Sequence, residues 1–458
     1  MGSPEVDQLL VWADHQRIRH DGIAPVAFQG LRGMAASKDL QPEDELTSVP
    51  LDLALVVPPR QPCPFPDFVM KEYWSGCPWF MKLALMLLYE QEQGSASRLA
   101  PYLEYLPKEF STPLGWSDEQ LQQLQYPFVT QEVKAQRQQW QELWAGFKRQ
   151  HPTTKLTNAR LIWALQCVRS RAFSGPFPGA SWKTRLKLLV PVVIIGTGIQ
   201  LAAHAAPDQL LNGLVAAALF NLIYDALLAR GLRAYTLCPF IDFMNHSSTA
   251  GGGVTYAYFR SAIVATAGRP FTAGDQVFIS YGKQTNDRLL QFYGFVEEDN
   301  PNDIFVICNS VSKLRRQGIK GAAFTSPRLE WLQSQRMRKD AEEILLTPRG
   351  LANVSAMALR ALVASDHEFA ERQAGGKLAF EQPLGTASEL AIRQAALKLS
   401  ESEFAIFEGK SPGNGPAELH DSHIHEVTNL IQNFRRQKRR LLLEAIDRLQ
   451  QGLQQLQK

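Results

Sequence analysis

Apolar residues recur along the chain with two different periods, and the changes of period divide it into successive regions. The first seventy residues read as short β-segments joined by turns, with glycines at 22, 30 and 33. Apolar residues then recur every three or four positions, which predicts helices over 78–93 and 158–173. A polar, Gln-rich helical region lies between these two helices, and Ser117 and Gln120 near its start have the spacing of a capping box.

Beyond residue 233 the pattern changes to period two and later returns to helical spacing. Period two predicts strands over 254–259, 261–266 and 276–281, followed by a short helix over 286–293 and a last strand over 304–309. The chain is then mainly helical, with predicted helices over 328–346, 354–365, 389–407 and 425–456. We therefore place a domain boundary near residue 310.

The segment 183–233 differs from the rest because it carries two long apolar runs. The runs cover 188–203 and 210–229, and a turn signal separates them, so the segment resembles a helical hairpin. A membrane-spanning helix needs about 20 mostly apolar residues, and the first run has only about 16. Asp225 in the second run would cost about 3 kcal/mol in lipid. Basic residues flank both outer ends, as in a hairpin that crosses a membrane twice. We favour packing on or within the soluble fold, and membrane insertion or association stays the alternative.

The composition excludes several classes of protein. The 458 residues are 45% hydrophobic and 20% charged, which is enough to bury a large core and excludes a disordered chain. A net charge of +3 is too small to indicate a nucleic-acid partner. The five cysteines are far apart and form no C-x-x-C pair, so we expect a reducing compartment and neither a disulfide framework nor a cysteine-rich zinc site. We expect no secretory signal, because residues 1–13 lack a basic segment followed by an apolar one.

Three short polar clusters are candidates for chemistry, although each alone has a simpler interpretation. Asp242 to Ser248 follows an apolar strand and includes Asn245 and His246, whose burial without partners would be costly. Alone, it reads as a polar turn. Tyr281 ends a predicted strand and alone would be a packed aromatic. The glycine-rich turn at 29–34 lacks the spacing and the following helix of a phosphate loop, so alone it reads as a hairpin turn.

The order of these clusters along the chain is more specific than any one of them. The glycine-rich turn is followed by Ser-Arg-Ala-Phe-Ser at 170–174, Asp-Phe-Met-Asn-His-Ser at 242–247, Tyr-Gly at 281–282 and Phe-Tyr-Gly-Phe at 292–295. This order resembles the SET-domain protein methyltransferases of the Rubisco large-subunit lysine methyltransferase branch, over nearly the whole chain. The resemblance implies an α+β SET fold of short sheets over 1–310, with a helical insert at about 75–233, and an all-helical substrate-binding domain over 311–458.

The resemblance also implies a cofactor and its binding residues. S-adenosylmethionine and the target side chain enter a narrow channel from opposite faces in this family, and no metal is required. Gly30, Leu31, Arg32 and Gly33 would hold the cofactor through their backbone, since small residues let a main chain approach closely. The other implied cofactor residues are Arg171, which would bind the cofactor's carboxylate, Asn245, His246 and Tyr281.

The resemblance implies that Tyr281 is the catalytic residue. Its hydroxyl would orient the acceptor amine and the sulfonium of the cofactor. Asp242 and Tyr293 would line the lysine channel, and Arg171 and Tyr281 would also contact the substrate. The target lysine must lose a proton from a group with a reference pKa of about 10.4. Desolvation and the nearby sulfonium lower that pKa, so no dedicated base is demanded, and alignment of the reacting atoms carries much of the rate.

The implied activity is methylation of a lysine side chain in a non-histone protein substrate, in the cytoplasm or the chloroplast. Two alternatives stay open. One is protein-histidine methylation within the same branch, and the other is a catalytically weak SET scaffold bound to a membrane or a complex. Two positions depart from the family pattern, Arg32 where a smaller or apolar residue is expected and Gly175 where a basic one is common. Both bear on the substrate more than on the fold.

Two further polar clusters lie near the C-terminus. His420, His423 and His425 with Asp421 could bind a metal, but we favour a solvated helix start and predict no metal site. The basic run 435–440 on the last helix is interpreted as a solvated face in preference to a docking surface for an acidic partner or lipid headgroups.

Overall fold

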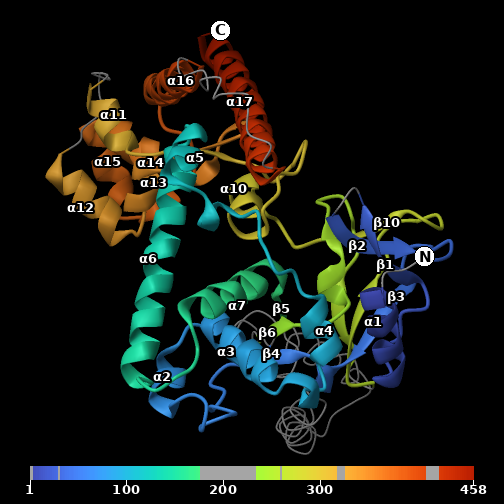
Figure 1. Cartoon of the computed structure of the whole chain (residues 1–458). Helices are drawn as coiled ribbons and strands as arrows, with labels where there is room; N and C mark the ends of the chain where they lie inside the picture. Colours follow the sequence, from blue (N-terminus) through green and yellow to red (C-terminus); the bar gives the residue numbers. More distant parts are fainter. Residues whose placement is uncertain are drawn as a thin grey trace, which may run out of the picture. The chain divides into compact units, whose positions relative to one another are not determined.

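The computed structural model describes residues 4–28, 31–175, 234–257, 260–316, 325–408 and 422–457 (Figure 1). Gly30 and the predicted hairpin 183–233 lie outside the described residues. The chain forms two compact units, and each is described by itself. The first unit comprises Met1–Phe110 and Gln139–Gly282, and the second comprises Ser111–Gln138 and Lys283–Lys458. The predicted domain boundary near 310 stays a prediction.

A four-stranded sheet in the first unit joins strands from distant parts of the sequence. Its order is β1 (Ile23–Phe28), β2 (Leu31–Ala36), β10 (Gln276–Ile279) and β7 (Asn245–His246). β2 pairs antiparallel with both β1 and β10, whereas β10 and β7 are parallel. The glycine-rich turn, the Asn-His segment and the strand that leads to Tyr281 are therefore neighbours in one sheet.

Two three-stranded sheets also lie in the described part of the first unit. One has the order β3 (Glu45–Pro50), β9 (Ala262–Thr266) and β8 (Val254–Ala257), and the other has the order β4 (Leu55–Val57), β6 (Ala234–Leu237) and β5 (Phe173–Gly175). The strands predicted from period two are thus present as β8, β9 and β10. Burial alternates along β10, whereas β9 is buried at four consecutive positions.

The described helices of the first unit include the predicted α3 (Trp79–Glu92) and α7 (Asn158–Arg171), which pack against each other. α1 (Pro4–His15), α2 (Lys71–Gly76) and α4 (Ala100–Tyr105) were not predicted. The prediction of only β-segments near the N-terminus was wrong, because α1 buries Leu9, Trp12 and Ala13 at helical spacing. Among the described helices, none is long and apolar enough to span a membrane.

The second unit is helical around one small sheet. Its helices are α5 (Asp118–Gln123), the first part of α6 (Pro127–Gln150), α10 (Asn286–Arg288), α11 (Ser310–Arg316), α12 (Ser326–Ser334), α13 (Arg338–Glu342), α14 (Asn353–Val363), α15 (Asp366–Gln373), α16 (Thr386–Glu408) and α17 (Ser422–Gln457). The predicted capping box at the start of α5 is confirmed: Ser117 Oγ accepts from the Gln120 amide at 3.2 Å, and Gln120 Oε1 accepts from the Ser117 amide at 2.8 Å.

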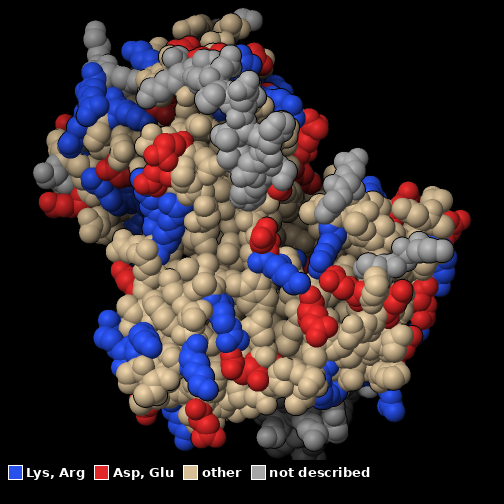
Figure 2. All heavy atoms as spheres, in the orientation of Figure 1, with Lys and Arg blue, Asp and Glu red and all other residues tan. Residues whose placement is uncertain are grey.

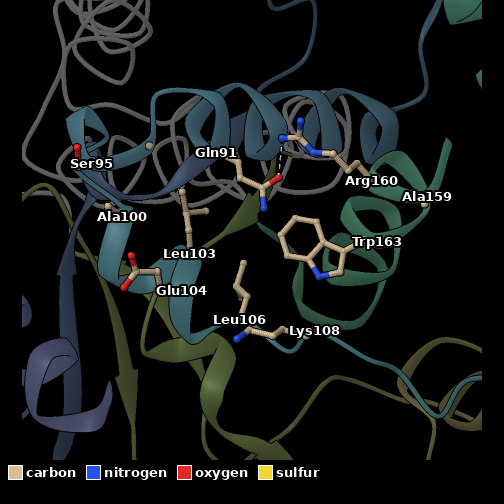
Figure 3. A pocket seen from close by; sticks show the side chains of 11 residues that line it. Gln91, Ser95, Ala100, Leu103, Glu104, Leu106, Lys108, Ala159, Arg160 and Trp163 are labelled. Atoms are coloured by element: carbon tan, nitrogen blue, oxygen red, sulfur yellow. Dashed lines mark hydrogen bonds between the residues drawn. The ribbon is translucent and has the colours of Figure 1, made fainter. Parts of the chain in front are cut away.

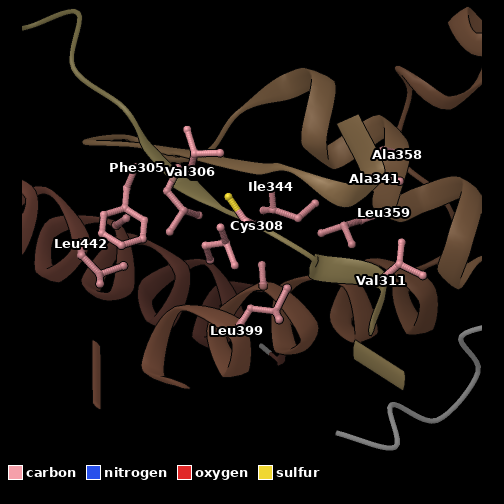
Figure 4. Close-up of a cluster of buried hydrophobic side chains, with 14 of the residues drawn as sticks. Phe305, Val306, Cys308, Val311, Ala341, Ile344, Ala358, Leu359, Leu399 and Leu442 are labelled. Atoms are coloured by element: carbon pink, nitrogen blue, oxygen red, sulfur yellow. The ribbon is translucent and has the colours of Figure 1, made fainter. Parts of the chain in front are cut away.

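The C-terminal helical region differs from the prediction most between residues 326 and 351, and α11 and α15 were not predicted. The predicted helix 328–346 is two short helices followed by β12 (Ile344–Thr347), which pairs with β11 (Phe305–Ile307) and β13 (Gly350–Leu351). β11 would otherwise leave its backbone groups unpaired in the core of the unit, and β12 satisfies them. Figure 4 shows Phe305, Val306 and Ile344 within this core, together with Leu399 of α16 and Leu442 of α17.

Several charges of the basic run 435–440 on α17 are paired within the second unit, although Arg436, Arg439 and Arg440 remain exposed. Arg435 donates to the backbone carbonyls of Gln123 and Phe407 at 3.2 Å. Arg439 pairs with Glu408 and Arg440 with Asp299. The predicted solvated face is therefore confirmed for the exposed arginines and wrong for Lys438, which is buried.

Lys438, within the same run, is fully buried and holds together a polar network in the core. Its ammonium lies 2.7 Å from Asp303 Oδ1 and 2.8 Å from Asp287 Oδ1, and it donates to the Ile304 carbonyl at 2.6 Å. The Tyr126 ring centroid lies 5.4 Å from the ammonium. Burial raises the pKa of Asp287 to about 7, while Lys438 opposes that shift. A buried charge needs such partners, since its desolvation is costly.

Candidate functional site

Strand alternation in the four-stranded sheet decides which side chains share a face. The register pairs Gln276 with Ala35 and Phe278 with Asn245, so Gln276 and Asn245 share the face that carries Gly33. His246 projects to the opposite face, with the buried Met34, Val277 and Ile279. The Asn-His pair predicted as one cofactor-binding element therefore presents its two side chains on opposite faces of the sheet.

Gly33 lies directly beneath the amide side chains of Gln276 and Asn245, a group that we call the cradle, and any larger residue would displace them. A Cβ at this position would lie 2.8 Å from Gln276 Nε2 and 2.9 Å from Asn245 Nδ2. Asn245 Nδ2 also donates to the Arg32 carbonyl at 3.0 Å, which fixes the turn to β7. Gln276 Nε2 is buried and has no hydrogen-bond partner among the residues that the structure describes. The cradle thus contains an amide donor, Gln276 Nε2, that has no partner among the described residues. A polar ligand at this point would satisfy that donor.

Gln276 did not feature in the sequence-based set of site residues. The sequence feature that could have indicated Gln276 as a site residue is its position at the start of the predicted strand 276–281, five residues before Tyr281. Only the register of β10 against β2 shows that its side chain shares a face with Gly33.

Tyr281 and His246 form a second cluster, at the end of β10. The Tyr281 amide donates to His246 Nδ1 at 3.0 Å, and the two rings stack with centroids 5.0 Å apart. Because Nδ1 accepts, the proton of the neutral imidazole is assigned to Nε2. The Tyr281 hydroxyl donates to the Met244 carbonyl at 2.8 Å. The phenol therefore points at the backbone immediately before Asn245, and His246 fixes the strand end that carries it.

Arg171 and Asp242 form a third cluster, in which Asp242 is buried and Arg171 is partly buried. Arg171 ends α7, and its Nε lies 3.9 Å from Asp242 Oδ2. Asp242 also accepts from the Tyr102 hydroxyl at 2.7 Å. Burial raises the pKa of Asp242 to about 7, although Arg171 and the Tyr102 hydrogen bond both lower it. The structure thus brings together two of the predicted site residues and adds Tyr102, which sequence reasoning missed.

The backbone before Asp242 is strained. Phe240 has φ 65° and ψ −43°, and the Ile241 amide donates to the Pro239 carbonyl at 2.8 Å, which makes a γ-turn of the rare, strained type. A bulky side chain seldom adopts this conformation, and such strain clusters at functional sites. The turn directs the 3₁₀ segment Ile241–Phe243 so that Asp242 points inward.

Arg32, which departs from the family pattern, turns its side chain away from the cradle. Its guanidinium lies 4.7 Å from the Tyr105 ring centroid and donates to the Tyr105 carbonyl. The Arg32 carbonyl accepts from Asn245 Nδ2, so the backbone of Arg32 faces the cradle. The Arg32 side chain anchors the turn to α4. Leu31 is 60% exposed.

Tyr293 belongs to the second unit, so its predicted place in a lysine channel stays a prediction. It ends a π-helical turn, Leu289–Tyr293, that Gly294 terminates with φ 75°. Its ring packs edge-on against Phe295 with centroids 6.3 Å apart.

A cavity of about 600 Å³ lies elsewhere in the first unit, between α3, α4 and α7. In Figure 3 the indole of Trp163 lies across it from Leu103, with Glu104 and Lys108 nearby. None of the predicted site residues lines this cavity.

Neither the charges on the face shown in Figure 2 nor the metal-ligating side chains of the described residues indicate a further site. On the face shown in Figure 2 basic and acidic side chains are interspersed over the described residues. Within the described ranges no three His, Cys, Asp or Glu side chains are grouped to hold a metal ion. His420 and Asp421 of the predicted histidine cluster lie outside those ranges, and His425 is exposed at the start of α17.

Sequence comparisons find distant relatives, and no protein-family model matches the chain. Human "SET domain-containing protein 4" is 24% identical over 322 residues, 65% of this chain and 60% of that protein. The "Actin-histidine N-methyltransferase" of Danio rerio is 24% identical over 325 residues, 68% of this chain and 45% of that protein. "Ribosomal lysine N-methyltransferase set11" of Schizosaccharomyces pombe is 36% identical over 67 residues, 15% of this chain and 17% of that protein. The chain spans less than two thirds of the length of these relatives.

Structural comparison extends over nearly the whole chain. The "Structure of Rubisco LSMT bound to AdoMet" has a TM-score of 0.63 and 17% identity, and the match covers 99% of this chain and 93% of that one. The "Crystal structure of the SET domain of LSMT bound to Lysine and AdoHcy" has a TM-score of 0.64 and 15% identity, with coverage of 99% and 92%. The chain therefore has a SET fold like that of the Rubisco methyltransferase, and the predicted resemblance in fold is confirmed.

Proposed function

We propose that the chain is an S-adenosylmethionine-dependent methyltransferase that modifies a lysine side chain of a non-histone protein. The observation that carries the proposal is the convergence of Gly33, Asn245 and Tyr281 on neighbouring strands of one sheet. The relatives support the same class, since they include a ribosomal lysine and an actin-histidine methyltransferase. Solved structures of the same fold contain AdoMet, AdoHcy and lysine.

The residues present fit the cofactor. The unsatisfied amide of Gln276, which lies over Gly33 together with the Asn245 amide, suits a polar ligand. Asn245 would complete this cradle, and Arg171 would bind the ligand's carboxylate with its guanidinium. When bound, S-adenosylmethionine supplies a methyl group on a positively charged sulfur.

The acceptor amine needs orientation and a neutral nitrogen. The Tyr281 hydroxyl, held toward the Met244 carbonyl, would direct the nitrogen lone pair along the line of transfer. A dry channel lowers the pKa of the amine, so that it loses its proton to solvent before it reacts. The helical region after residue 310 would dock the protein that carries the amine.

We expect Gly33→Ala to raise the dissociation constant for S-adenosylmethionine by about tenfold, because the new methyl group displaces Asn245 and closes the cradle. The matched control is Gly76→Ala at the end of α2, where a Cβ meets no atom within 4 Å. Isothermal titration of both variants measures the effect. Equal affinities for the two variants would remove Gly33 from the cofactor site.

The proposed activity is tested with the full chain and cofactor labelled on its methyl group. The protein is incubated with a native lysate, and the labelled product is identified by fragment mass spectrometry. We expect methyllysine in one or a few non-histone proteins. Methylhistidine as the only product would replace lysine by histidine as the acceptor, and the absence of any protein label despite cofactor binding would favour a scaffold.

A further inference from the structure

Asp242 has features that a channel-lining residue does not need. Its side chain is 0% exposed, so its carboxylate faces the protein interior rather than an open channel. Oδ2 accepts from the Tyr102 hydroxyl, whereas Oδ1 is buried without a hydrogen-bond partner among the described residues. A buried carboxylate that is only partly satisfied is unfavourable for stability, which suggests that the charge is retained for a purpose.

The charged group that faces Asp242 is Arg171. Arg171 Nε is also buried and makes no hydrogen bond within the described part of the chain, and it faces Asp242 Oδ2 at 3.9 Å. Nη1 donates to the Ser170 hydroxyl at 2.9 Å. One edge of the guanidinium is thus directed at Asp242, and 20% of the side chain stays exposed for a ligand.

Tyr102 completes the arrangement from a third element. It is fully buried on α4, and its ring packs near Phe243, the neighbour of Asp242, with centroids 5.8 Å apart. Tyr102 and Asp242 are 140 residues apart in sequence, so their hydrogen bond fixes the 3₁₀ segment against α4. The strained γ-turn at Phe240 holds the same segment from its other end.

We propose that Tyr102 and Asp242 are positioning residues for the cofactor: the Tyr102 hydroxyl fixes the Asp242 carboxylate, and the carboxylate orients the Arg171 guanidinium toward the cofactor's carboxylate. This inference rests on the proposed function, because it assigns Arg171 to the cofactor. It separates the Asp242 side chain, which acts through Arg171, from the Asp242 backbone, which remains available to line a channel.

The arrangement makes cofactor affinity depend on pH. The titratable and charged groups around Asp242 are Tyr102 of α4, Arg171 and Cys167 of α7, and Cys238 after β6. Burial raises the pKa of Tyr102, Cys167 and Cys238, so these three stay neutral near pH 7. Asp242, with its pKa raised to about 7, is the group that titrates. Its carboxylate is present above that pH and is lost below it, so affinity falls as the pH drops.

The test is isothermal titration of S-adenosylmethionine into the full chain between about pH 5.5 and 8.5. Tyr102→Phe removes a hydrogen bond that lowers the Asp242 pKa, so we expect the pH midpoint of binding to rise and the dissociation constant at pH 7 to increase about tenfold. Asp242→Asn keeps the shape but removes the charge, so its binding is expected to be weak at every pH. Tyr73→Phe is the matched control, because Tyr73 donates its hydroxyl to the Leu143 carbonyl at 2.8 Å, outside this cluster.

The possible results separate this inference from the proposed function. If the unchanged protein binds no S-adenosylmethionine, the proposed function fails. If it binds and both variants keep the unchanged affinity and pH profile, only the positioning role fails. The positioning role also fails if the variants change KM for the protein substrate while their cofactor affinity stays unchanged. Asp242 would then act on the acceptor. Unfolding midpoints of the variants verify that they are folded.

Discussion

Tyr281→Phe is expected to lower kcat by about 10²–10³-fold while cofactor affinity stays nearly unchanged, the size of effect seen when one preorganised hydrogen-bond donor is removed. The phenylalanine ring can keep its stacking on His246, and the backbone amide still donates to His246 Nδ1. Only the hydroxyl directed at the Met244 carbonyl is lost. Initial rates of methyl transfer at saturating cofactor, combined with a calorimetric titration, separate turnover from binding.

A matched control for this change is Tyr235→Phe, since the Tyr235 ring stacks on Trp79 at 4.0 Å in a different sheet of the same unit. That variant should keep its turnover. If Tyr281→Phe also keeps its turnover, the hydroxyl has no part in the reaction. If it instead loses cofactor binding with no change in kcat, Tyr281 belongs to the cofactor site alone.

Lys438→Met is expected to reduce the free energy of unfolding by about 3–5 kcal/mol near pH 7.5, because removing one partner leaves a buried charge uncompensated. Asp287 and Asp303 would then face each other in the core without the ammonium. The loss should shrink as the pH is lowered, since Asp287, whose pKa burial already raises to about 7, takes up a proton and becomes neutral. Chemical denaturation at pH 7.5 and 5.5 measures both effects.

Lys339→Met provides the comparison, because Lys339 pairs with Glu343 on the surface with 73% of its side chain exposed. A surface pair of this kind contributes only about 0–1 kcal/mol. Adding Asp287→Asn to Lys438→Met should restore part of the stability. A Lys438→Met protein as stable as the unchanged chain at pH 7.5 would show that the buried network does not need its cation.

Local patterns made much of the fold predictable. The periods in the sequence predicted α3, α7 and the strands β8, β9 and β10. The capping box at Ser117 followed from two residues three positions apart. Local patterns were less reliable where pairing decides the structure: β12 was predicted as helix, and β11 fixes it as a strand.

The candidate site was only partly predictable, because its decisive contacts join distant residues. The short motifs indicated Gly33, Asn245 and Tyr281, which the four-stranded sheet brings together. Nothing local indicates Tyr102, whose partner Asp242 is 140 residues away. The basic run that contains Lys438 predicts a solvated face. Lys438 is nevertheless buried, because its ammonium pairs with Asp303, 135 residues earlier in the chain.

The central claim is that the cradle around Gly33 and Asn245 binds S-adenosylmethionine. Isothermal titration of S-adenosylmethionine into the full chain, repeated with Asn245→Ala, tests this claim most directly. The account predicts saturable binding at one site per chain and affinity at least about tenfold lower in the variant, as the loss of an amide that contacts the ligand and secures the turn implies. Absence of binding to the unchanged protein, or equal affinity of the two proteins, would contradict it.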